Sequence, residues 1–284
     1  MPQGHQGGIT LILIASSNKD IASLNIAKQI LNSYPFPETT EIFQENPIYE
    51  ANITNRRVKL VTLNEESIRA QNLPALFNDL ELIVFISKHS SESGTPTLSV
   101  HTPGNLGDAE LGGVPRRVSI SPANAMRDAL KALMRLRDAM KLGYEVSYEG
   151  THHGPSLDVP TMFVELGSSP KQWSDLSGAV AVAQATMEAV SEFDNRTSKV
   201  VIGIGGTHYN AKFTRITMEN DVAFSHMIPK YAIPDLDVEM LSQCVNRTLE
   251  EVEYAILDWK GIKSENKPSL VRMLNDIGLM FEKI

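Results

Sequence analysis

Cysteine is almost absent from this sequence. The chain of 284 residues contains a single cysteine, Cys244. One cysteine cannot form an intramolecular disulfide, and such usage is typical of proteins in a reducing compartment. We therefore expect the protein to be cytoplasmic. Cys244 lies in an apolar pattern with helical spacing, which favours a position in the core over a role as a nucleophile.

Long hydrophobic runs and an excess of positive charge are missing as well. No apolar stretch approaches the ~20 residues that span a bilayer, so we expect no membrane partner. Residues 1–8 lack the basic start of a secretory signal and are predicted to be a flexible lead-in. The formal net charge of -8 argues against broad, nonspecific binding of nucleic acid, although it permits a local basic patch.

Strand-like and helix-like segments alternate along the chain. The expected strands cover residues 9–15, 40–44, 58–63, 81–87, 144–148, 161–166, 200–204, 222–227, 252–258 and 279–282. The expected helices cover residues 21–33, 67–77, 122–142, 171–193, 238–249 and 268–277. This alternation predicts an α/β fold with a largely parallel sheet and helices on both sides. No repeat or linker divides the chain, so we expect one domain over residues 1–284.

A turn with two adjacent histidines stands near the middle of the chain. It comprises residues 149–155 (Glu-Gly-Thr-His-His-Gly-Pro) and lies between two strand-like runs. Imidazole titrates near neutral pH and is the commonest metal ligand, so a histidine pair on a turn points to chemistry. A polar loop without function explains one isolated pair equally well. Because adjacent residues of an extended segment point to opposite faces, we expect His152 and His153 to have different roles.

The positions of the other histidines favour an active site. Apart from His5, each lies within or directly after a strand-like run, and these residues are His89, His101, His208 and His226. Ligands of open α/β sheets bind beyond the carboxyl ends of the strands. We therefore expect several of these imidazoles to meet at one edge of the sheet.

Two chemistries suit such a cluster. In the first, neutral imidazoles together with Glu149, Glu165 or Asp158 hold a zinc ion that lowers the pKa of a bound water. In the second, one histidine acts as a general base on water, and backbone N–H groups near Gly205 and Gly206 stabilise an oxyanion. The sequence has no His-Glu-x-x-His, Cys-x-x-Cys, Walker loop or Gly-x-Ser-x-Gly elbow. No motif therefore selects between the two chemistries.

A series of segments, in order along the chain, resembles the D-aminoacyl-tRNA deacylases of the archaeal and plant type. They are residues 87–91, 101–105, 148–155, 165–169, 203–209, 224–226, 229–231 and 258–261, together with Trp173. The first seventy or so residues match only in outline. One departure is Gly150, where the family pattern has alanine; this exchange alters loop flexibility more than chemistry.

The resemblance implies hydrolysis of the ester that links a D-amino acid to the terminal ribose of tRNA. A tRNA carrying a D-amino acid is then the expected partner. The resemblance also implies a three-layer α/β/α sandwich with a mixed, largely parallel sheet, similar to phosphorylase and peptidyl-tRNA hydrolase folds. Zinc is the cofactor that it implies. No feature of the sequence requires a dimer, and we expect a monomer.

Under this hypothesis, His152 and His153 are the catalytic residues, and Glu149 orients an imidazole. His89 and His208 are the expected metal ligands. The residues expected to bind substrate are Lys88, His101, Gly205, Gly206, Tyr209, Lys230 and Tyr231. The patterns leave open which imidazole of the pair does the work, and whether it holds a metal or a proton.

Basic side chains give a second set of expectations. Arg127, Lys131 and Arg135 recur along one side of the 122–142 helix, and this row forms either a solvated face or a contact with tRNA phosphates. Further expected tRNA contacts are Arg116, Arg117 and Lys212, with Trp259 as a stacking partner for the terminal adenosine. Two alternative functions stay open: a zinc-dependent hydrolase of a small ester, amide or nucleoside, and a tRNA-binding module without catalysis.

Overall fold

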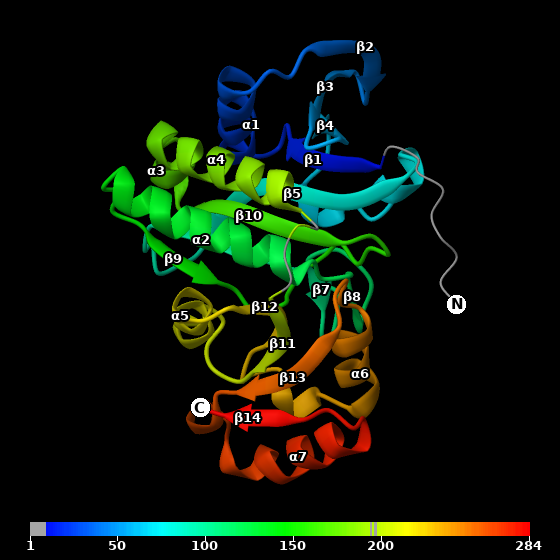
Figure 1. Ribbon diagram of the computed structural model, residues 1–284, viewed down its shortest axis with the longest axis vertical. Coiled ribbons are helices and arrows are strands. Elements are labelled where there is room, and N and C mark those ends of the chain that lie inside the picture. Colours follow the sequence, from blue (N-terminus) through cyan, green and yellow to red (C-terminus); the bar gives the residue numbers. More distant parts are fainter. Residues whose placement is uncertain (1–9, 194, 196–197) are drawn as a thin grey trace.

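Two β-sheets, one below the other in Figure 1, organise the chain. The computed structural model describes residues 10–193, 195 and 198–284. The lead-in expected at residues 1–8, which includes His5, lies outside the described residues. No helix within the described ranges has the length and apolar content that a membrane span requires.

The larger sheet has eight strands in the order β2-β3-β4-β1-β5-β10-β6-β9. Its central strands β4 (Arg56–Leu63), β1 (Leu11–Ser17), β5 (Leu80–Ser90) and β10 (Thr161–Ser168) are parallel to one another. On one side, β6 (Thr97–His101) runs antiparallel to β10, and β9 (Glu145–Tyr148) is parallel to β6. On the other side, β2 (Glu38–Phe43) and β3 (Asn46–Ile53) add antiparallel pairs. The sheet is therefore mixed and parallel at its centre, as predicted.

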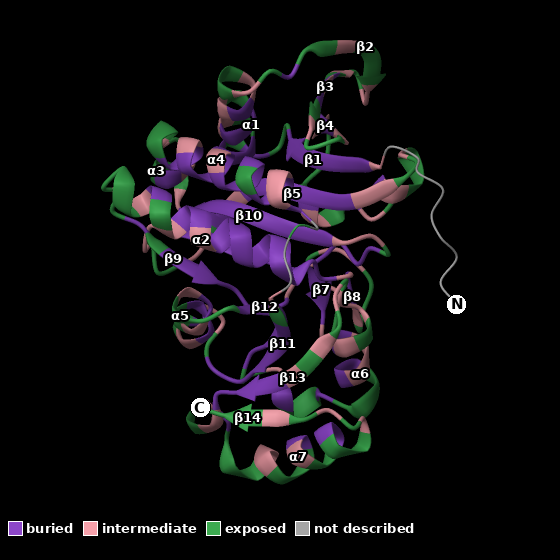
Figure 2. Cartoon of the chain, in the orientation of Figure 1, coloured by how far each residue is buried: buried purple, intermediate pink, exposed green. Residues whose placement is uncertain are grey.

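Alternate residues of the central strands face two different layers. One face packs against the helices α1 (Ile21–Ser33), α2 (Ala123–Ala139) and α4 (Leu176–Glu192). The other face carries Leu13, Phe85 and Phe163 and is covered by the short 3-10 helices η1 (Ser67–Arg69) and η2 (Leu73–Leu76). Figure 2 shows that β1, β5, β10 and the inner side of α2 are buried. The three-layer α/β/α prediction is confirmed, with one outer layer thinner than the other.

The smaller sheet contains four parallel strands in the order β12-β11-β13-β14. They are β12 (Val222–Ile228), β11 (Lys199–Ile204), β13 (Val252–Leu257) and β14 (Phe281–Lys283). One face packs against α2 and α5 (Ala211–Glu219), and the other against α6 (Val238–Asn246) and α7 (Lys267–Asp276). Because α2 contacts both sheets, it joins the two parts of the molecule.

Cys244 confirms its predicted core position. It is fully buried on α6, among apolar residues of the smaller sheet's core. Burial raises the pKa of its thiol to about 12. A thiol that stays protonated is a poor nucleophile.

Two predicted helices are wrong in type or extent, and β3 had no counterpart among the predicted elements. The helix expected at residues 67–77 is two 3-10 turns, because Pro74 cannot continue an α-helix from the preceding turn. The half-exposed position of β3 explains the polarity of its sequence. The helix expected at residues 171–193 is divided into α3 (Pro170–Trp173) and α4, because Asp175 caps a new helix by accepting a hydrogen bond from Ser177 N–H. Helix α5 had no counterpart among the predictions.

Candidate active site

The histidine turn is held from both sheets at once. After β9, Gly150 N–H donates to His208 O at 2.8 Å, and Thr151 N–H donates to Met227 O at 2.8 Å. The Thr151 hydroxyl also lies 3.2 Å from His226 Nδ1. His226 belongs to β12 and is fully buried, so it supports the turn from behind. The residues 149–155 therefore form a bridge between the larger and the smaller sheet.

His152 and His153 do not point to opposite faces, so that prediction is wrong. Their ring centroids lie 4.1 Å apart, and the His101 ring lies 4.4 Å from His152 and 4.9 Å from His153. His153 has a φ of 41°, in the left-handed region, which breaks the alternation of an extended segment. Three imidazoles are thus in mutual contact.

Backbone carbonyl groups set the tautomers of the pair. Nδ1 of His152 lies 2.8 Å from Gly150 O, and Nδ1 of His153 lies 2.8 Å from Gly154 O. A neutral imidazole that donates from Nδ1 keeps the lone pair of Nε2 for a metal or a proton. Burial, followed by the neighbouring imidazoles His153 and His101, lowers the pKa of His152 well below its usual value. Burial and His101 likewise lower the pKa of His153 to about 4.

Glu149 is the centre of the polar cluster. Its carboxylate is fully buried and lies 3.0 Å from His208 Nε2, 3.2 Å from His89 Nδ1 and 3.7 Å from His152 Nε2. Burial alone would raise the pKa of Glu149, but contacts with His208 and His89 hold it well below its usual range. The carboxylate is therefore ionised at neutral pH and faces three histidines from three different elements.

Glu165 provides a second buried carboxylate. Ser87 Oγ donates to its Oε1 at 2.6 Å, and His89 Nδ1 lies 3.5 Å from its Oε2. Burial opposes ionisation, but the nearby imidazoles of His101 and His89 lower the pKa of Glu165 to about 2. Burial would lower the pKa of His89, yet Glu149 and Glu165 together raise it to about 11. Tyr209 Oη, 3.0 Å from His89 Nε2, accepts the second N–H of this imidazolium.

The histidine pair stands between two cavities. The larger, of about 300 Å³, is lined by Lys19, Asp20, Glu66, Ser67, Ile68, Ser87, Lys88, His89, Ser90, Leu111, Glu149, His152, His153, Phe163, Glu165, His208 and Tyr209. The smaller, of about 240 Å³, is lined by Gly104, Asn105, Leu106, Gly107, Asp108, Thr151, His152, His153, Tyr231, Ala232 and Asp235. A substrate in either cavity meets the same two imidazoles.

The structure brings most of the expected site residues together. Around the larger cavity lie Lys88, His89, Glu149, His152, His153, His208 and Tyr209, and Tyr231 lines the smaller one. His101 is fully buried behind the pair. Gly205, Gly206 and Lys230 line neither cavity.

Gly205 cannot supply the oxyanion contact considered for it. Its N–H donates to Ile228 O at 2.8 Å within the smaller sheet. Gly206 O accepts a hydrogen bond from Lys230 N–H at 3.0 Å. These glycines shape the loop that carries His208 into the site.

Other lining residues had no signal in the sequence. Asp20 caps α1, because its Oδ1 accepts a hydrogen bond from Ser23 N–H at 3.1 Å. Its Oδ2 also accepts from Lys88 N–H at 2.6 Å, which ties the start of α1 to the end of β5. Glu66 and Phe163 come from a loop and a strand without distinctive motifs. Only the folded chain brings them to the cavity.

Three groups of side chains have ligand atoms within 4.8 Å of one another, as a metal site requires. They are His101 with His152 and His153, Glu149 with His152 and His208, and His89 with Glu149 and Glu165. The three-imidazole group fits zinc best, because both ring nitrogens of His101 are buried without a hydrogen-bond partner among the described residues. The predicted ligands His89 and His208 fall in separate groups that share Glu149. Asp158, also considered, belongs to none of the three.

The basic row on α2 does not form one exposed face. Arg127 is buried and is ion-paired with Asp128 and Asp221. Arg135 is exposed and contacts Glu188 of the neighbouring helix. Arg127 is therefore a structural residue, neither solvated nor free to meet a phosphate, because Asp221 approaches it from the smaller sheet.

Comparison with known proteins identifies the family of this chain. The family model described as D-aminoacyl-tRNA deacylase matches residues 76–282. A D-aminoacyl-tRNA deacylase of Thermococcus kodakarensis is 36% identical over 275 residues, which cover 95% of this chain and 98% of the relative. One of Pyrococcus furiosus is 36% identical over 277 residues, or 95% and 99% of the two chains.

A solved structure supports the fold over nearly the whole chain. A crystal structure of a conserved protein of unknown function matches with a TM-score of 0.86 at 30% sequence identity, covering 97% of this chain and 95% of that one. The family match exceeds half of the chain, and the relatives are matched over almost their full length. The chain therefore belongs to the D-aminoacyl-tRNA deacylase family.

Proposed function

We propose that the protein hydrolyses the ester of D-aminoacyl-tRNA and releases the D-amino acid and the tRNA. The observation that carries this proposal is the buried Glu149 carboxylate in contact with three histidines beside a cavity of about 300 Å³. Ester hydrolysis needs a group that takes a proton from water and returns it to the leaving alcohol. Membership of the deacylase family supplies the substrate class.

We assign the proton transfer to His208. Its Nε2–H donates to Glu149 Oε2 at 3.0 Å, which fixes the tautomer and leaves Nδ1 to accept a proton. Tyr231 Oη lies 3.4 Å from Nδ1 and can orient an incoming water or ribose hydroxyl. Glu149 then stabilises the imidazolium as it forms, as the carboxylate of a catalytic triad does. This assignment differs from the sequence prediction, which gave His208 to a metal.

We propose His101, His152 and His153 as the residues that would hold zinc. The lowered pKa values of His152 and His153 and the unpartnered ring nitrogens of His101 support this choice. When bound there, zinc would supply an activated water and would polarise the ester carbonyl. Gly150 O, 2.8 Å from His152 Nδ1, would orient this ligand from behind.

The aminoacyl group fits the larger cavity in this proposal. Ile68, Leu111 and Phe163 give part of its wall an apolar character suited to an amino-acid side chain. His89 and Lys88 add positive charge at the same wall. The tRNA strand must then approach over the surface beside His208.

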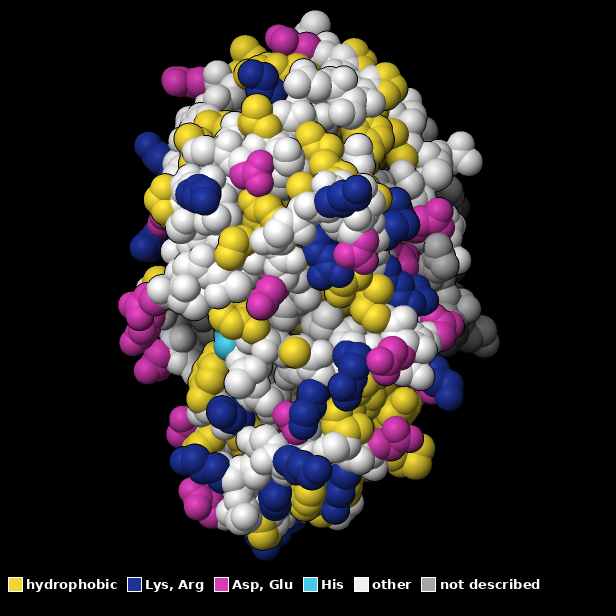
Figure 3. Space-filling view, turned by 90° about the vertical axis from the view of Figure 1, so that its left-hand side faces the viewer, with side chains coloured by type: hydrophobic (Ala, Val, Ile, Leu, Met, Phe, Trp, Pro, Cys, Tyr) yellow, Lys and Arg dark blue, Asp and Glu magenta, His cyan; other side chains and the backbone are white. Residues whose placement is uncertain are grey.

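An acidic protein needs a local basic surface for tRNA. Figure 3 shows Lys and Arg side chains gathered over the lower part of one face, below a visible histidine. Among the C-terminal residues, Lys260, Lys263 and Lys283 are exposed, and Lys283 Nζ lies 3.9 Å from the ring centroid of Trp259. We propose that this surface contacts phosphates of the tRNA, with binding that weakens as salt is added.

The test is deacylation of D-Tyr-tRNA and L-Tyr-tRNA by the purified protein. The proposal predicts hydrolysis of the D-ester and little of the L-ester. Equal hydrolysis of both esters, or no hydrolysis of either, would refute the proposal. A rate on a small D-tyrosine ester equal to that on the tRNA would favour the small-substrate hydrolase, and tRNA binding without turnover would favour the binding module. Metal analysis of the same preparation, with His101→Ala as the variant expected to lose zinc, tests the proposed ligands.

A further inference from the structure

A third cavity lies near the histidine turn and is lined by arginine. It measures about 400 Å³, and its lining consists of Val114, Pro115, Arg116, Arg117, Gln243 and Arg247. No acidic side chain belongs to this lining. Three guanidinium groups therefore meet solvent in one hollow of a protein whose net charge is -8. A hollow of this kind has the chemistry of an anion site, because guanidinium groups match the geometry of phosphate oxygens.

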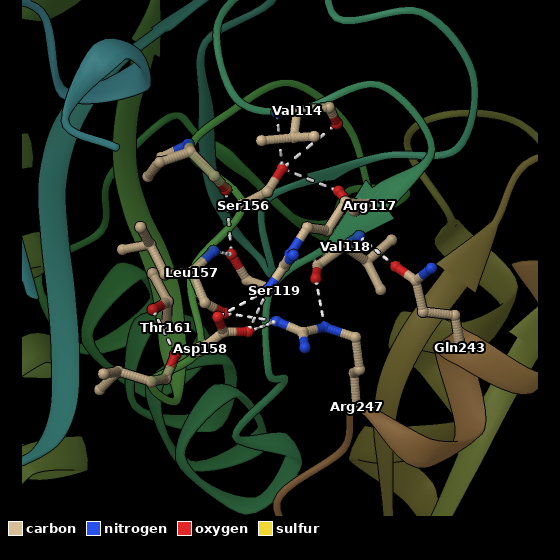
Figure 4. A network of polar contacts seen from close by, with 12 residues as sticks. Val114, Arg117, Val118, Ser119, Ser156, Leu157, Asp158, Thr161, Gln243 and Arg247 are labelled. Carbon is tan, nitrogen blue, oxygen red and sulfur yellow. Dashed lines mark hydrogen bonds and ion pairs between the residues drawn. The ribbon is translucent and has the colours of Figure 1, made fainter. Parts of the chain in front are cut away.

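The cavity is held in place by a polar network that Figure 4 shows from close by. Arg247 Nε donates to Val118 O at 2.6 Å, and its Nη2 donates to Leu157 O at 2.8 Å. Gln243 Oε1 accepts from Val118 N–H at 2.8 Å, and its Nε2 donates to Arg116 O at 3.2 Å. These bonds join the loop of β8 (Arg117–Val118) to α6. The arginines therefore project from a fixed frame.

The carboxylates nearby leave a surplus of positive charge. Asp158 accepts from Nη2 of both Arg117 and Arg247, and Asp237 accepts from Arg116. Three cations face two anions, which leaves one positive charge unbalanced. The hydrogen bonds of Arg117 and Arg247 to Asp158 use Nη2 of each guanidinium, and Nε of Arg117 is buried without a hydrogen-bond partner among the described residues. The arginines therefore have N–H donors that the two carboxylates do not use.

This cavity is close to the active-site histidines along the chain. Arg117 O accepts from Ser156 Oγ at 2.8 Å, and Arg247 contacts Leu157 and Asp158. Ser156 follows His153 by three residues, so its backbone lies within roughly 10 Å of that histidine. In addition, β7 (Gly104–Asn105) pairs with β8, and Gly104 N–H donates to His153 O at 2.6 Å.

We propose that the cavity between Arg116, Arg117 and Arg247 binds a backbone phosphate of the tRNA strand whose terminal ribose lies at the histidines. This inference rests on the proposed function. Its chemistry is that of a phosphodiester, and the proximity of the reacting ester favours the tRNA backbone over free phosphate. Phosphates recur along every nucleic-acid strand, so one falls at a fixed distance from the terminal ester. The site would fix the position of the strand without reading its sequence.

Arg116→Gln is the sharpest variant. The Arg116 side chain contacts only Asp237 among the described residues, and it is 42% exposed. Arg117 and Arg247 hold the frame, so their variants are less informative. The matched control is Arg57→Gln, because Arg57 is 38% exposed and ion-paired with Glu50 at the far side of the larger sheet. Both changes remove one guanidinium from one surface ion pair.

The assay compares D-Tyr-tRNA with D-tyrosyl-adenosine, which has the ester but no phosphate. For Arg116→Gln, the ratio of kcat/KM on tRNA to kcat/KM on the adenosine ester should fall roughly 10-fold, the loss expected for one charged hydrogen bond. The change should appear in KM, and the slope of log KM against log salt should decrease by about 0.7. The ratio for Arg57→Gln should stay as in the wild type.

Each possible result either supports or overturns the proposal. An unchanged ratio for Arg116→Gln, with the wild type active on both substrates, would overturn the phosphate site and leave the deacylase function standing. A wild type inactive on both substrates would overturn the deacylase function itself. Inorganic phosphate provides a further test. The proposal predicts that phosphate competes with D-Tyr-tRNA but does not affect hydrolysis of D-tyrosyl-adenosine. An effect of phosphate on D-tyrosyl-adenosine hydrolysis that Arg116→Gln abolishes would show a free-anion site and overturn it.

Discussion

Replacing Glu149 by glutamine removes the charge at the centre of the site and keeps its shape. The carboxylate is completely buried and contacts His208, His89 and His152 at 3.0, 3.2 and 3.7 Å. An amide of the same size can still accept a hydrogen bond from His208. It cannot stabilise an imidazolium electrostatically. The change therefore separates the charge of Glu149 from its packing.

The expected loss of rate follows from the proposed role of Glu149. A positioned acid–base group contributes roughly 10²–10⁴ to the rate, and the carboxylate behind a catalytic histidine supplies much of that effect. We expect kcat on D-Tyr-tRNA to fall within that range while KM changes little. The loss of charge also acts on His89, whose pKa is about 11 with Glu149 present. That pKa should fall in the variant, because one of its two carboxylate partners is gone.

Single-turnover deacylation of D-Tyr-tRNA measures the first effect, and thermal unfolding establishes that the variant is folded. The control is Glu145→Gln at the start of the preceding strand β9, because Glu145 is exposed. It should keep the wild-type rate, since surface changes of this kind alter stability by only about 0.5 kcal/mol. A folded Glu149→Gln protein with a rate within threefold of the wild type would refute the proposed role.

Three further predictions concern stability and metal. Burial lowers the pKa of His226 to about 4 in the folded protein. Between pH 4 and pH 6.5, the unfolded state therefore binds more protons than the folded state. The unfolding free energy decreases as pH falls through that window. From pH 7 to pH 5, the wild type should lose roughly 2 kcal/mol more unfolding free energy than His226→Asn in urea titrations; equal losses would contradict the assignment. Arg127→Met removes the buried guanidinium that pairs with Asp128 and Asp221 and should lower the unfolding free energy by about 3–5 kcal/mol. Arg135→Met, at an exposed pair, should cost about 1 kcal/mol or less. Removal of zinc by a chelator should abolish deacylation in the wild type, with recovery on adding zinc; full activity in a protein shown to be metal-free would exclude zinc from the reaction.

Local patterns predicted the architecture and the location of the site. The apolar run at β1 and the alternation of strands with helices are properties of short segments, so they are visible without the fold. The sequence predicted that the histidines meet, but its reason was wrong: His101 ends β6, which is antiparallel to β10, and His208 follows β11 of the smaller sheet, so the site does not lie at one edge of a parallel sheet. Contacts between segments that are far apart in the sequence could not be predicted from local patterns. Arg127 has the spacing of a surface residue, and only the approach of Asp221 explains its burial.

The geometry of the histidine pair shows the same limit at closer range. The alternation rule places His152 and His153 on opposite faces, and it holds only while the backbone stays extended. The φ of 41° at His153 follows from how the turn is tied to both sheets, which no local pattern encodes. The roles of the imidazoles therefore depend on tertiary contacts. The division of the helix at residues 171–193 had a local signal in Asp175, whose capping preference the apolar pattern outweighed.

The measurement that tests the central claim most directly is the ratio of deacylation rates on D-Tyr-tRNA and L-Tyr-tRNA, taken for the wild type beside His208→Gln. The account predicts a large ratio in favour of the D-ester for the wild type. It predicts a fall in the D-rate of roughly 10²–10⁴ for the variant. A wild type that does not distinguish the two esters, or a variant that keeps the full D-rate, would contradict it.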